Sequence, residues 1–424
     1  MTPTRLGKRV LFVGQYSPPS ALSAARRTAG FTKYLSRLGY RVTVLTSIVS
    51  GLGEIEGATR VVRTGDLMSS RLNWRRHNLR TISGAGEGSA YGSASRLETI
   101  VVPDVSLLTW LPFALPRALR LARAERLDCV ITTSPPESTH LVGLALRRAG
   151  IPWIADFRDG WTFETLHDPW PFAIQRRADS ALERAVVRRA DAVIGVTAPI
   201  AEDLRERFAP VRAAVITNGY DPEQIPRDVP ADPLLNGDRH SLVHTGRMAV
   251  ARRTPRHLLE AVRRLSNESP DDAGKLEIIF AGPLSHEERA LIEAPDLAGA
   301  ARAVGAVDHQ QALRLQQGAD SLLLFAQGST RRSVATGKLY EYLAAGRPIL
   351  VLGEESEAAR IVMETGAGQV VAADDPAAIG EALRRLVRSS GTGATPGSVA
   401  KYSYPEIAAQ VADLIEEVCG GRAE

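Results

Sequence analysis

Short runs of apolar, often β-branched residues alternate along the chain with longer stretches in which apolar residues recur every three or four positions. The short runs are typical of strands buried on both faces, and the longer stretches are typical of amphipathic helices. At the start of the chain, Arg9–Val13 predicts a strand, Ala24–Leu38 a helix that ends at Gly39, and Arg41–Leu45 a second strand. This βαβ opening predicts an α/β fold with parallel sheets.

The alternation continues through the first half of the chain. Further strands are predicted at Val61–Val62, Ile100–Val102, Cys129–Thr132, Trp153–Asp156, Ala192–Val196 and Ala214–Thr217. Helices are predicted at Leu115–Arg126, Thr139–Ala149 and Trp170–Arg189. The stretch Ser83–Ser95 is rich in Gly, Ser and Ala, which predicts a loop or a disordered segment instead.

The same pattern starts again at Ser241. Strands are predicted at Ser241–Thr245, Leu276–Ala281, Ala301–Val304, Ser321–Phe325 and Pro348–Leu352. Helices are predicted at Pro255–Ser266, His309–Gln317 and Leu339–Ala345. We therefore expect two doubly wound, Rossmann-like domains that face each other across a cleft.

The boundary between these domains is predicted within Asn218–His240, where four prolines stand among acidic and glycine residues. We expect an N-terminal domain over residues 1–217, a linker over 218–240 and a C-terminal domain over 241–403. The segment 404–424 begins with the amphipathic pattern Tyr404–Cys419, and we expect this last helix to pack back on the N-terminal domain.

Composition narrows the class of protein. The 424 residues suit two or three domains, and 44% hydrophobic with 24% charged residues are typical of a globular protein. The two cysteines, Cys129 and Cys419, form neither a disulfide framework nor a metal-ligand spacing, so we expect a reducing cytoplasm and no metal site. No apolar stretch is long enough to cross a membrane. The net charge of +4 comes without any nucleic-acid-binding motif, so no nucleic-acid partner is expected.

The segment from Thr336 to Pro348 predicts a loop, then a helix, and then the end of that helix at Gly346 and Pro348. Thr336 can cap the helix, and Gly337 allows close approach of a ligand. A helix N-terminus attracts anions and Lys338 adds a full positive charge, so a diphosphate fits there. Glu341 lies one turn further on, within reach of ribose hydroxyls. Taken alone, the pattern fits an ordinary capped surface helix equally well.

This segment resembles the nucleotide-sugar segment of glycosyltransferase family 4, which also has a Glu at the position of Glu341 and a helix end rich in Ala and Gly. The strand Ser241–Thr245 followed by Gly246–Arg247 resembles the family's strand and glycine–arginine turn. There the arginine and a basic residue five positions later, here Arg252, contact the donor diphosphate. The alternative is that Arg247 and Arg252 are merely solvated. The resemblance implies nucleotide-sugar contacts by Gly246, Ser333, Thr336, Gly337, Leu339 and Glu341, with Lys338 as a further cation.

A second polar cluster, residues 153–161, spans the end of a predicted strand of the first half, where ligands of doubly wound sheets bind. It resembles a similar turn in a subgroup of family 4, and the likeness covers nearly the whole chain. We expect catalytic contacts from Arg158 and Asp159, and acceptor contacts from residues of this turn, of the first loop and of the following helix: Asp156, Trp161, Ser20, Ser23 and His140. For His140, a solvated or capping role is the alternative.

Three features depart from the family pattern. Many members carry a glutamate where Ser333 stands and a histidine where Arg158 stands, so these roles do not transfer directly. The first loop lacks the family's glycine-rich turn, and the absence of GxGxxG argues against an NAD-dependent dehydrogenase. Arg26 and Arg27 at the start of the first helix either bind anionic groups or are solvated.

The resemblance implies a glycosyltransferase of the hexosyltransferase type with the GT-B fold. It would move a sugar from a nucleotide-diphosphate sugar to a hydroxyl or amine acceptor, with retention and without a metal or other cofactor. The acceptor would be a small molecule, a glycan or a lipid-linked compound. Two alternatives stay open: a sugar-nucleotide epimerase, and a catalytically silent relative that binds a nucleotide sugar or a partner. Residues 107–122, apolar with basic neighbours, either rest on the inner face of a membrane or pack inside the first domain.

Overall fold

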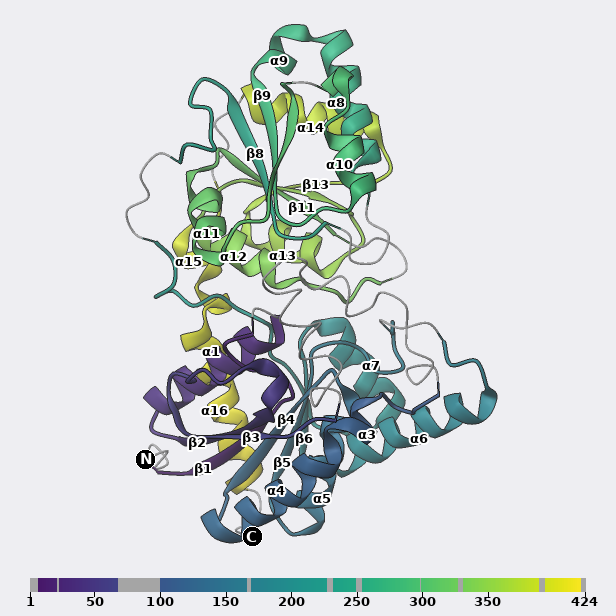
Figure 1. Cartoon of the computed structure of the whole chain (residues 1–424), viewed down its shortest axis with the longest axis vertical. Helices are drawn as coiled ribbons and strands as arrows, with labels where there is room; N and C mark the ends of the chain where they lie inside the picture. The colour runs from purple at the N-terminus through teal and green to yellow at the C-terminus, as the bar shows by residue number, and fades with distance from the viewer. Residues whose placement is uncertain are drawn as a thin grey trace. The chain divides into compact units, whose positions relative to one another are not determined.

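The chain divides into two units, unit 1 and unit 2 (Figure 1). The computed structural model describes residues 7–20, 23–67, 100–165, 169–226, 232–248, 254–297, 299–326, 331–388 and 393–420. Unit 1 contains the described residues up to Gly219 and those from Tyr404 onward. Unit 2 contains Tyr220–Ser403. After the described residues of unit 2, the chain returns to unit 1 for its last helix.

Unit 1 is built on a parallel sheet of seven strands in the order β3-β2-β1-β4-β5-β6-β7. Val10 of β1 pairs with Val42 of β2 on one side and with Cys129 of β4 on the other, so the strand order reverses at β1 and β4. The strands are β1 (Arg9–Val13), β2 (Arg41–Ser47), β3 (Ala58–Thr64), β4 (Cys129–Ser134), β5 (Trp153–Phe157), β6 (Ala192–Gly195) and β7 (Ala213–Val215).

Helices cover both faces of this sheet, each with its own apolar core (Figure 1). One core includes α4, α5, α6 and α7, and the other includes α1 and α16. The contact between α1 and α16 is close, because a Cβ atom on Gly30 would come within 2.4 Å of the Tyr404 ring. The helices are α1 (Ser23–Arg37), η1 (Ile48–Ser50), α3 (Ser106–Thr109), α4 (Leu111–Glu125), η3 (Glu137–Thr139), α5 (His140–Arg148), α6 (Ala173–Arg189), α7 (Ala198–Phe208) and α16 (Tyr404–Gly420).

Unit 2 repeats the design with six parallel strands in the order β10-β9-β8-β11-β12-β13. The order reverses between β8 and β11, which is where doubly wound sheets bind ligands. The strands are β8 (His240–Thr245), β9 (Leu276–Ala281), β10 (Ala301–Gly305), β11 (Ser321–Phe325), β12 (Ile349–Leu352) and β13 (Gly368–Val371). The helices are α8 (Arg256–Glu268), α9 (Pro270–Gly274), α10 (His286–Ile292), η4 (Pro295–Leu297), α11 (His309–Gly318), α12 (Gly337–Ala345), α13 (Glu357–Thr365), α14 (Pro376–Arg388), α15 (Pro396–Val399) and η5 (Ala400–Tyr402).

The predicted fold class, an α/β protein with two Rossmann-like sheets, is confirmed. One predicted strand is wrong: residues 100–102 form a turn and bends, because the apolar run is only three residues long and Pro103 cannot donate a ladder hydrogen bond. The helix predicted from Trp170 begins only at Ala173, after an extended Phe172. The predicted loop Ser83–Ser95 lies outside the described residues. Within the described part of the chain, no helix is long and apolar enough to cross a bilayer.

Candidate functional site

The carboxyl end of β8 turns sharply at Gly246, which has a positive φ of 76°. The Gly246 amide donates a hydrogen bond of 2.6 Å to the Ala281 carbonyl of β9. A Cβ atom at Gly246 would lie only 2.9 Å from Cε of Lys338. A glycine is therefore needed for two reasons, its backbone conformation and the side chain that lies against it.

Helix α12 brings Lys338 to this turn. The Lys338 ammonium donates a hydrogen bond to the Arg247 carbonyl oxygen, so the predicted residues Gly246, Arg247 and Lys338 lie together. At the start of α12, the first amides have no intrahelical acceptor and favour an anion. Thr336 occupies the N-cap position with extended backbone, but its hydroxyl makes no capping bond, contrary to prediction. That buried oxygen has no partner among the described residues.

His244, which the sequence analysis overlooked, connects the turn to the helix. Its side chain is buried at the end of β8, and Nδ1 lies 2.9 Å from the Leu323 carbonyl oxygen of β11. Nε2 lies 3.4 Å from the Arg247 carbonyl oxygen. Because a carbonyl only accepts and the Nδ1 contact is the shorter of the two, we assign the proton to Nδ1, which leaves Nε2 with a lone pair. Nε2 lies 3.5 Å from the Lys338 ammonium. His244 thus orients Lys338 at the point where the strand order reverses.

Glu341 is held by a buried polar network. Gln316 of α11 donates through Nε2 to Oε2 of Glu341 at 3.3 Å and to Oγ1 of Thr245 at 2.9 Å. The Thr245 amide in turn donates to the Tyr342 hydroxyl at 2.9 Å. Burial raises the pKa of Tyr342 to about 12, so the hydroxyl stays protonated. The network fixes Glu341 one helical turn after Lys338.

The remaining predicted residues of unit 2 differ in exposure. Gly337 opens α12, and Ser333 is buried just before it. The Leu339 side chain is fully buried in the core, so only its backbone can meet a ligand. Arg252 lies outside the described residues. The structure therefore gathers Gly246, Arg247, Lys338 and Glu341 at one end of the sheet.

In unit 1, Asp156 is part of the interior. Arg27 donates to it through Nε at 2.9 Å and Nη2 at 2.7 Å, and both side chains are fully buried. Thr133 adds a hydrogen bond of 2.7 Å to the same carboxylate. Arg27 also donates to the carbonyl oxygens of Ile216 and Thr217. Asp156 thus forms a buried ion pair, and its predicted contact with an acceptor stays a prediction. Arg27 is buried, so it is neither solvated nor an exposed anion site.

His140 and Trp161 are also interior residues. His140 is fully buried, with Nδ1 2.8 Å from Thr132 Oγ1 and its ring 4.6 Å from that of Phe157. Burial lowers the pKa of His140 to about 3, so the ring is neutral. Trp161 is buried and donates from Nε1 to Asp179 at 2.7 Å. These contacts support the turn after β5 and bury both side chains, and their predicted contact with an acceptor stays a prediction.

Arg158 and Asp159 are half-buried where β4 and β5 end. The Arg158 guanidinium donates from Nε to the Ser134 carbonyl at 2.8 Å and from Nη2 to the Pro135 carbonyl. Burial lowers the pKa of Arg158, and the charge of Asp159 opposes this shift. Ser20 is half-buried, with its amide 3.1 Å from the Ser17 carbonyl, and Ser23 is the first residue of α1.

Glu137 is a further titratable residue at this sheet edge, and it was not among the predicted site residues. It follows β4 in the short helix η3 and is half-buried. Burial, with a smaller contribution from the nearby charge of Asp104, raises the pKa of Glu137 to about 8. The signal in the sequence that could have identified Glu137 is its position directly after a buried strand and two prolines.

The raised pKa of Glu137 makes the stability of unit 1 depend on pH. The folded-state pKa lies above the ordinary value of 4.5, so the folded protein binds this proton more tightly and stability falls as pH rises from about 4.5 to about 8. Glu137→Gln should reduce the loss of unfolding free energy between pH 5 and pH 9 by roughly 1–2 kcal/mol, since the half-buried group keeps some water. Urea unfolding at each pH, followed by tryptophan fluorescence, measures this change in the free energy of unfolding. Glu206→Gln, on the exposed side of α7, is the control, and equal pH dependence in both variants would contradict the assignment.

Two family models match the chain. Residues 24–219 match the Glycosyl transferase 4-like domain, and residues 239–389 match Glycosyl transferases group 1. A comparison with curated proteins found no match. Together the two matched segments span most of both units.

Solved structures show the same fold over the whole chain. Sucrose-phosphate synthase from Thermosynechococcus elongatus is 16% identical, with 98% of this chain and 100% of that chain covered and a TM-score of 0.67. The N-terminal domain of trehalose-6-phosphate phosphatase from Candida albicans is 13% identical, with 97% of each chain covered and a TM-score of 0.66. A UDP-N-acetylglucosamine 2-epimerase is 16% identical, with 99% and 98% covered and a TM-score of 0.54. At these identities the likeness concerns the fold alone.

The two sheets carry the strand order of doubly wound Rossmann-like domains, and both units match glycosyltransferase models. The chain therefore belongs to the glycosyltransferases of the GT-B fold.

Proposed function

We propose that the protein transfers a sugar from a nucleotide-diphosphate sugar to a hydroxyl or amine acceptor, as a retaining, family 4-type hexosyltransferase that needs no metal or other cofactor. The observation that carries the donor assignment is the meeting of Lys338 and the Gly246–Arg247 turn at the start of α12. The Lys338 ammonium, the backbone of the turn that carries Arg247 and the N-terminus of α12 meet there. Such a place suits a diphosphate.

The chemistry requires stabilisation of the leaving diphosphate. As the bond between the anomeric carbon and the phosphate oxygen breaks, negative charge grows on the diphosphate. Lys338, Arg247 and the first amides of α12 would stabilise this charge, with Arg252 as a further candidate. The acceptor oxygen or nitrogen forms the new bond to the same carbon, and its proton passes to the departing phosphate oxygen. This scheme needs no protein base.

We assign acceptor recognition to Arg158 and Asp159. They are the predicted residues that follow β5 and keep partial exposure, whereas Asp156, His140 and Trp161 are buried. A guanidinium held by two backbone carbonyls is preorganised for a polar or anionic acceptor group. This choice replaces the wider acceptor-side set.

An assay of turnover distinguishes the glycosyltransferase from the two alternatives, an epimerase and a catalytically silent relative. Purified protein is incubated with a panel of UDP-, GDP- and TDP-sugars, while thermal stabilisation and nucleotide release are followed. Nucleotide release that depends on an added sugar acceptor supports transfer. Isomerisation of the donor without nucleotide release would identify an epimerase, and stabilisation without turnover would identify a binding protein. The glycosyltransferase models matched by both units support transfer.

Glu341→Ala should weaken nucleotide binding about 10- to 100-fold, the range for a lost hydrogen bond to a charged group. The reason is that Gln316 holds the Glu341 carboxylate in place for ribose hydroxyls. Calorimetric titration with UDP and GDP, each beside its 2′,3′-dideoxy analogue, measures the contribution of the ribose hydroxyls directly. The native protein should prefer the ribose form, and the variant should bind both forms equally.

Glu381→Ala is the matched control, because this glutamate is exposed on α14. It should keep the native preference for ribose. A Glu341→Ala variant that binds both forms more weakly but still prefers ribose would show damage to the unit rather than loss of a ribose contact. That result would remove Glu341 from the donor site.

A further inference from the structure

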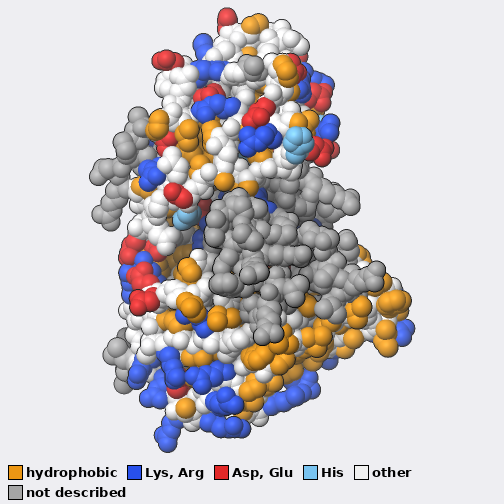
Figure 2. Space-filling view, viewed as in Figure 1, with side chains coloured by type: hydrophobic (Ala, Val, Ile, Leu, Met, Phe, Trp, Pro, Cys, Tyr) orange, Lys and Arg blue, Asp and Glu red, His pale blue; other side chains and the backbone are white. Residues whose placement is uncertain are grey.

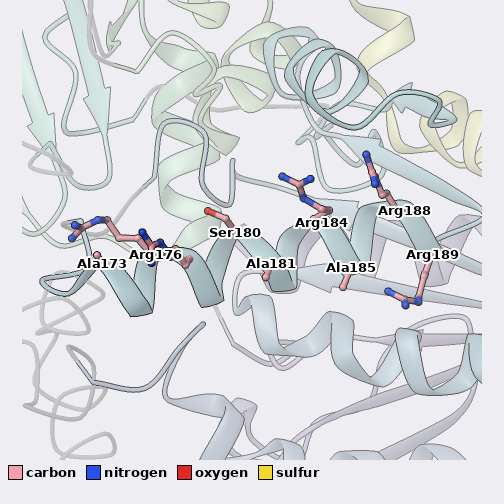
Figure 3. A pocket seen from close by; sticks show the side chains of 9 residues that line it. Ala173, Arg176, Ser180, Ala181, Arg184, Ala185, Arg188 and Arg189 are labelled. Carbon is pink, nitrogen blue, oxygen red and sulfur yellow. The ribbon is translucent and has the colours of Figure 1, made fainter.

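The outward face of α6 forms a basic groove. This open groove of about 920 Å³ is lined by nine residues of the helix, five of them arginines: Ala173, Arg176, Arg177, Ser180, Ala181, Arg184, Ala185, Arg188 and Arg189. Arg184 and Arg188 extend in the same direction from successive turns (Figure 3). With 17 residues, α6 is about 25 Å long. The basic face is therefore extended and does not converge on one point.

No acidic residue of α6 offsets these charges on the outward face. The helix contains two acids, Asp179 and Glu183, and both are buried. Asp179 accepts hydrogen bonds from Trp161 and Trp170, while Glu183 accepts from Thr162 and Arg207.

The arginines of the groove are largely unpaired. Arg176 donates to the carbonyl oxygens of Trp170 and Pro171. Arg177, Arg184, Arg188 and Arg189 make no ion pair with any residue that the structure describes. By contrast, exposed arginines of unit 2 such as Arg264 and Arg289 pair with glutamates four positions away in the sequence. A row of unpaired guanidinium groups favours an extended polyanion.

Exposed apolar side chains lie at the first turn of the same helix. Phe172 is 64% exposed and Ile174 is 76% exposed. Ile100, also 61% exposed, is adjacent, because Gln175 donates to its carbonyl oxygen at 3.1 Å. Figure 2, in the view of Figure 1, shows hydrophobic and basic side chains gathered along the side of unit 1 where α6 lies. Large apolar side chains in contact with water mark an interaction surface.

We propose that this face of α6 docks on an anionic lipid bilayer. The arginines meet lipid phosphates, and Phe172, Ile174 and Ile100 enter the boundary between headgroups and acyl chains. A soluble acidic polymer would satisfy the arginines and leave the three apolar side chains in water. A bilayer satisfies both kinds of group. The surface belongs to unit 1, and the proposal does not depend on the donor chemistry.

Co-sedimentation of the full chain with vesicles tests the proposal. Vesicles of phosphatidylcholine mixed with phosphatidylglycerol should bind the protein, those of phosphatidylcholine alone should not, and salt should weaken binding. Replacing three groove arginines by glutamine should reduce binding at least about tenfold, as expected for residues near an anionic surface: Arg177, Arg184 and Arg188. Phe172→Ser with Ile174→Ser should also weaken binding.

The control removes equal charge from exposed helices of unit 2, at Arg264, Arg289 and Arg385. Binding should then change by less than about twofold, since these side chains lie on other helices. Equal losses in both triple variants, or no binding of the native protein to the mixed vesicles, would overturn the proposal. Arginine-dependent binding of polyphosphate or an acidic peptide without binding of vesicles would overturn it too, in favour of a soluble polyanion.

Discussion

Replacing Arg27 by alanine should lower the free energy of unfolding of unit 1 by about 3–5 kcal/mol. The variant leaves the Asp156 carboxylate in the interior without its counterion, where the Thr133 hydroxyl still donates to it. It also removes the hydrogen bonds to the carbonyl oxygens of Ile216 and Thr217. A buried charge without its counterion costs far more than the pair contributes when intact.

Tryptophan fluorescence isolates this effect. The five tryptophans of the chain all precede residue 171, within the sequence range of unit 1, and residues 220–403 contain none. Urea unfolding followed by fluorescence therefore reports unit 1, while circular dichroism reports both units. The fluorescence midpoint should fall strongly, with the unfolding of unit 2 little changed.

The matched control is Arg37→Ala, on the same helix. Arg37 pairs with the exposed Glu56 at 3.2 Å, so its loss should cost less than about 1 kcal/mol. If Arg27→Ala does not fold, Asp156→Asn provides the second measurement, because it removes one charge and keeps the shape. Destabilisation by Arg27→Ala no greater than that by Arg37→Ala would show that the pair contributes nothing.

The layered fold could be predicted because parallel strands buried on both faces appear as nearly continuous apolar runs. Strand β11, with the sequence Ser-Leu-Leu-Leu-Phe, and strand β9 were predicted with their observed bounds. Residues 100–102 are apolar as well, but a run of three residues is too short to predict a strand reliably. Helices α13 and α14 and strand β13, which follow β12, are not among the predicted elements. For β13 the reason is that this edge strand is short and only partly buried.

The start of α12 could be predicted because its signals are local: a glycine, a lysine and a glutamate at helical spacing. Asp156 could not be placed correctly, because its partner Arg27 is 129 positions away in the sequence. His244 was hidden within an apolar strand, and Gln316 within an ordinary amphipathic helix. Their roles depend on which elements become neighbours, which no local pattern encodes.

Lys338→Ala should reduce the rate of sugar transfer about 100- to 1,000-fold, the effect of removing one preorganised group that stabilises a developing charge. The ammonium is directed by the Arg247 carbonyl and by Nε2 of His244, so it is held in place before the donor binds. Because charge on the diphosphate increases as the glycosidic bond breaks, kcat should fall more than KM rises. Steady-state assay of nucleotide release, with the donor found in the nucleotide-sugar panel, measures both.

Lys275→Ala is the control, because this exposed lysine precedes β9 at the opposite end of the same sheet, whereas the Gly246 turn meets the carboxyl end of β9. Its kcat should stay within about twofold of the native value, since an exposed charge at that distance is screened by salt.

Lys338→Arg separates the effect of the charge from the effect of its position. The Gly246 backbone lies against the lysine stem, so a planar guanidinium fits poorly and should recover only part of the rate. Full activity in Lys338→Ala would mean that the diphosphate is stabilised elsewhere, and the donor site would have to be moved from the start of α12.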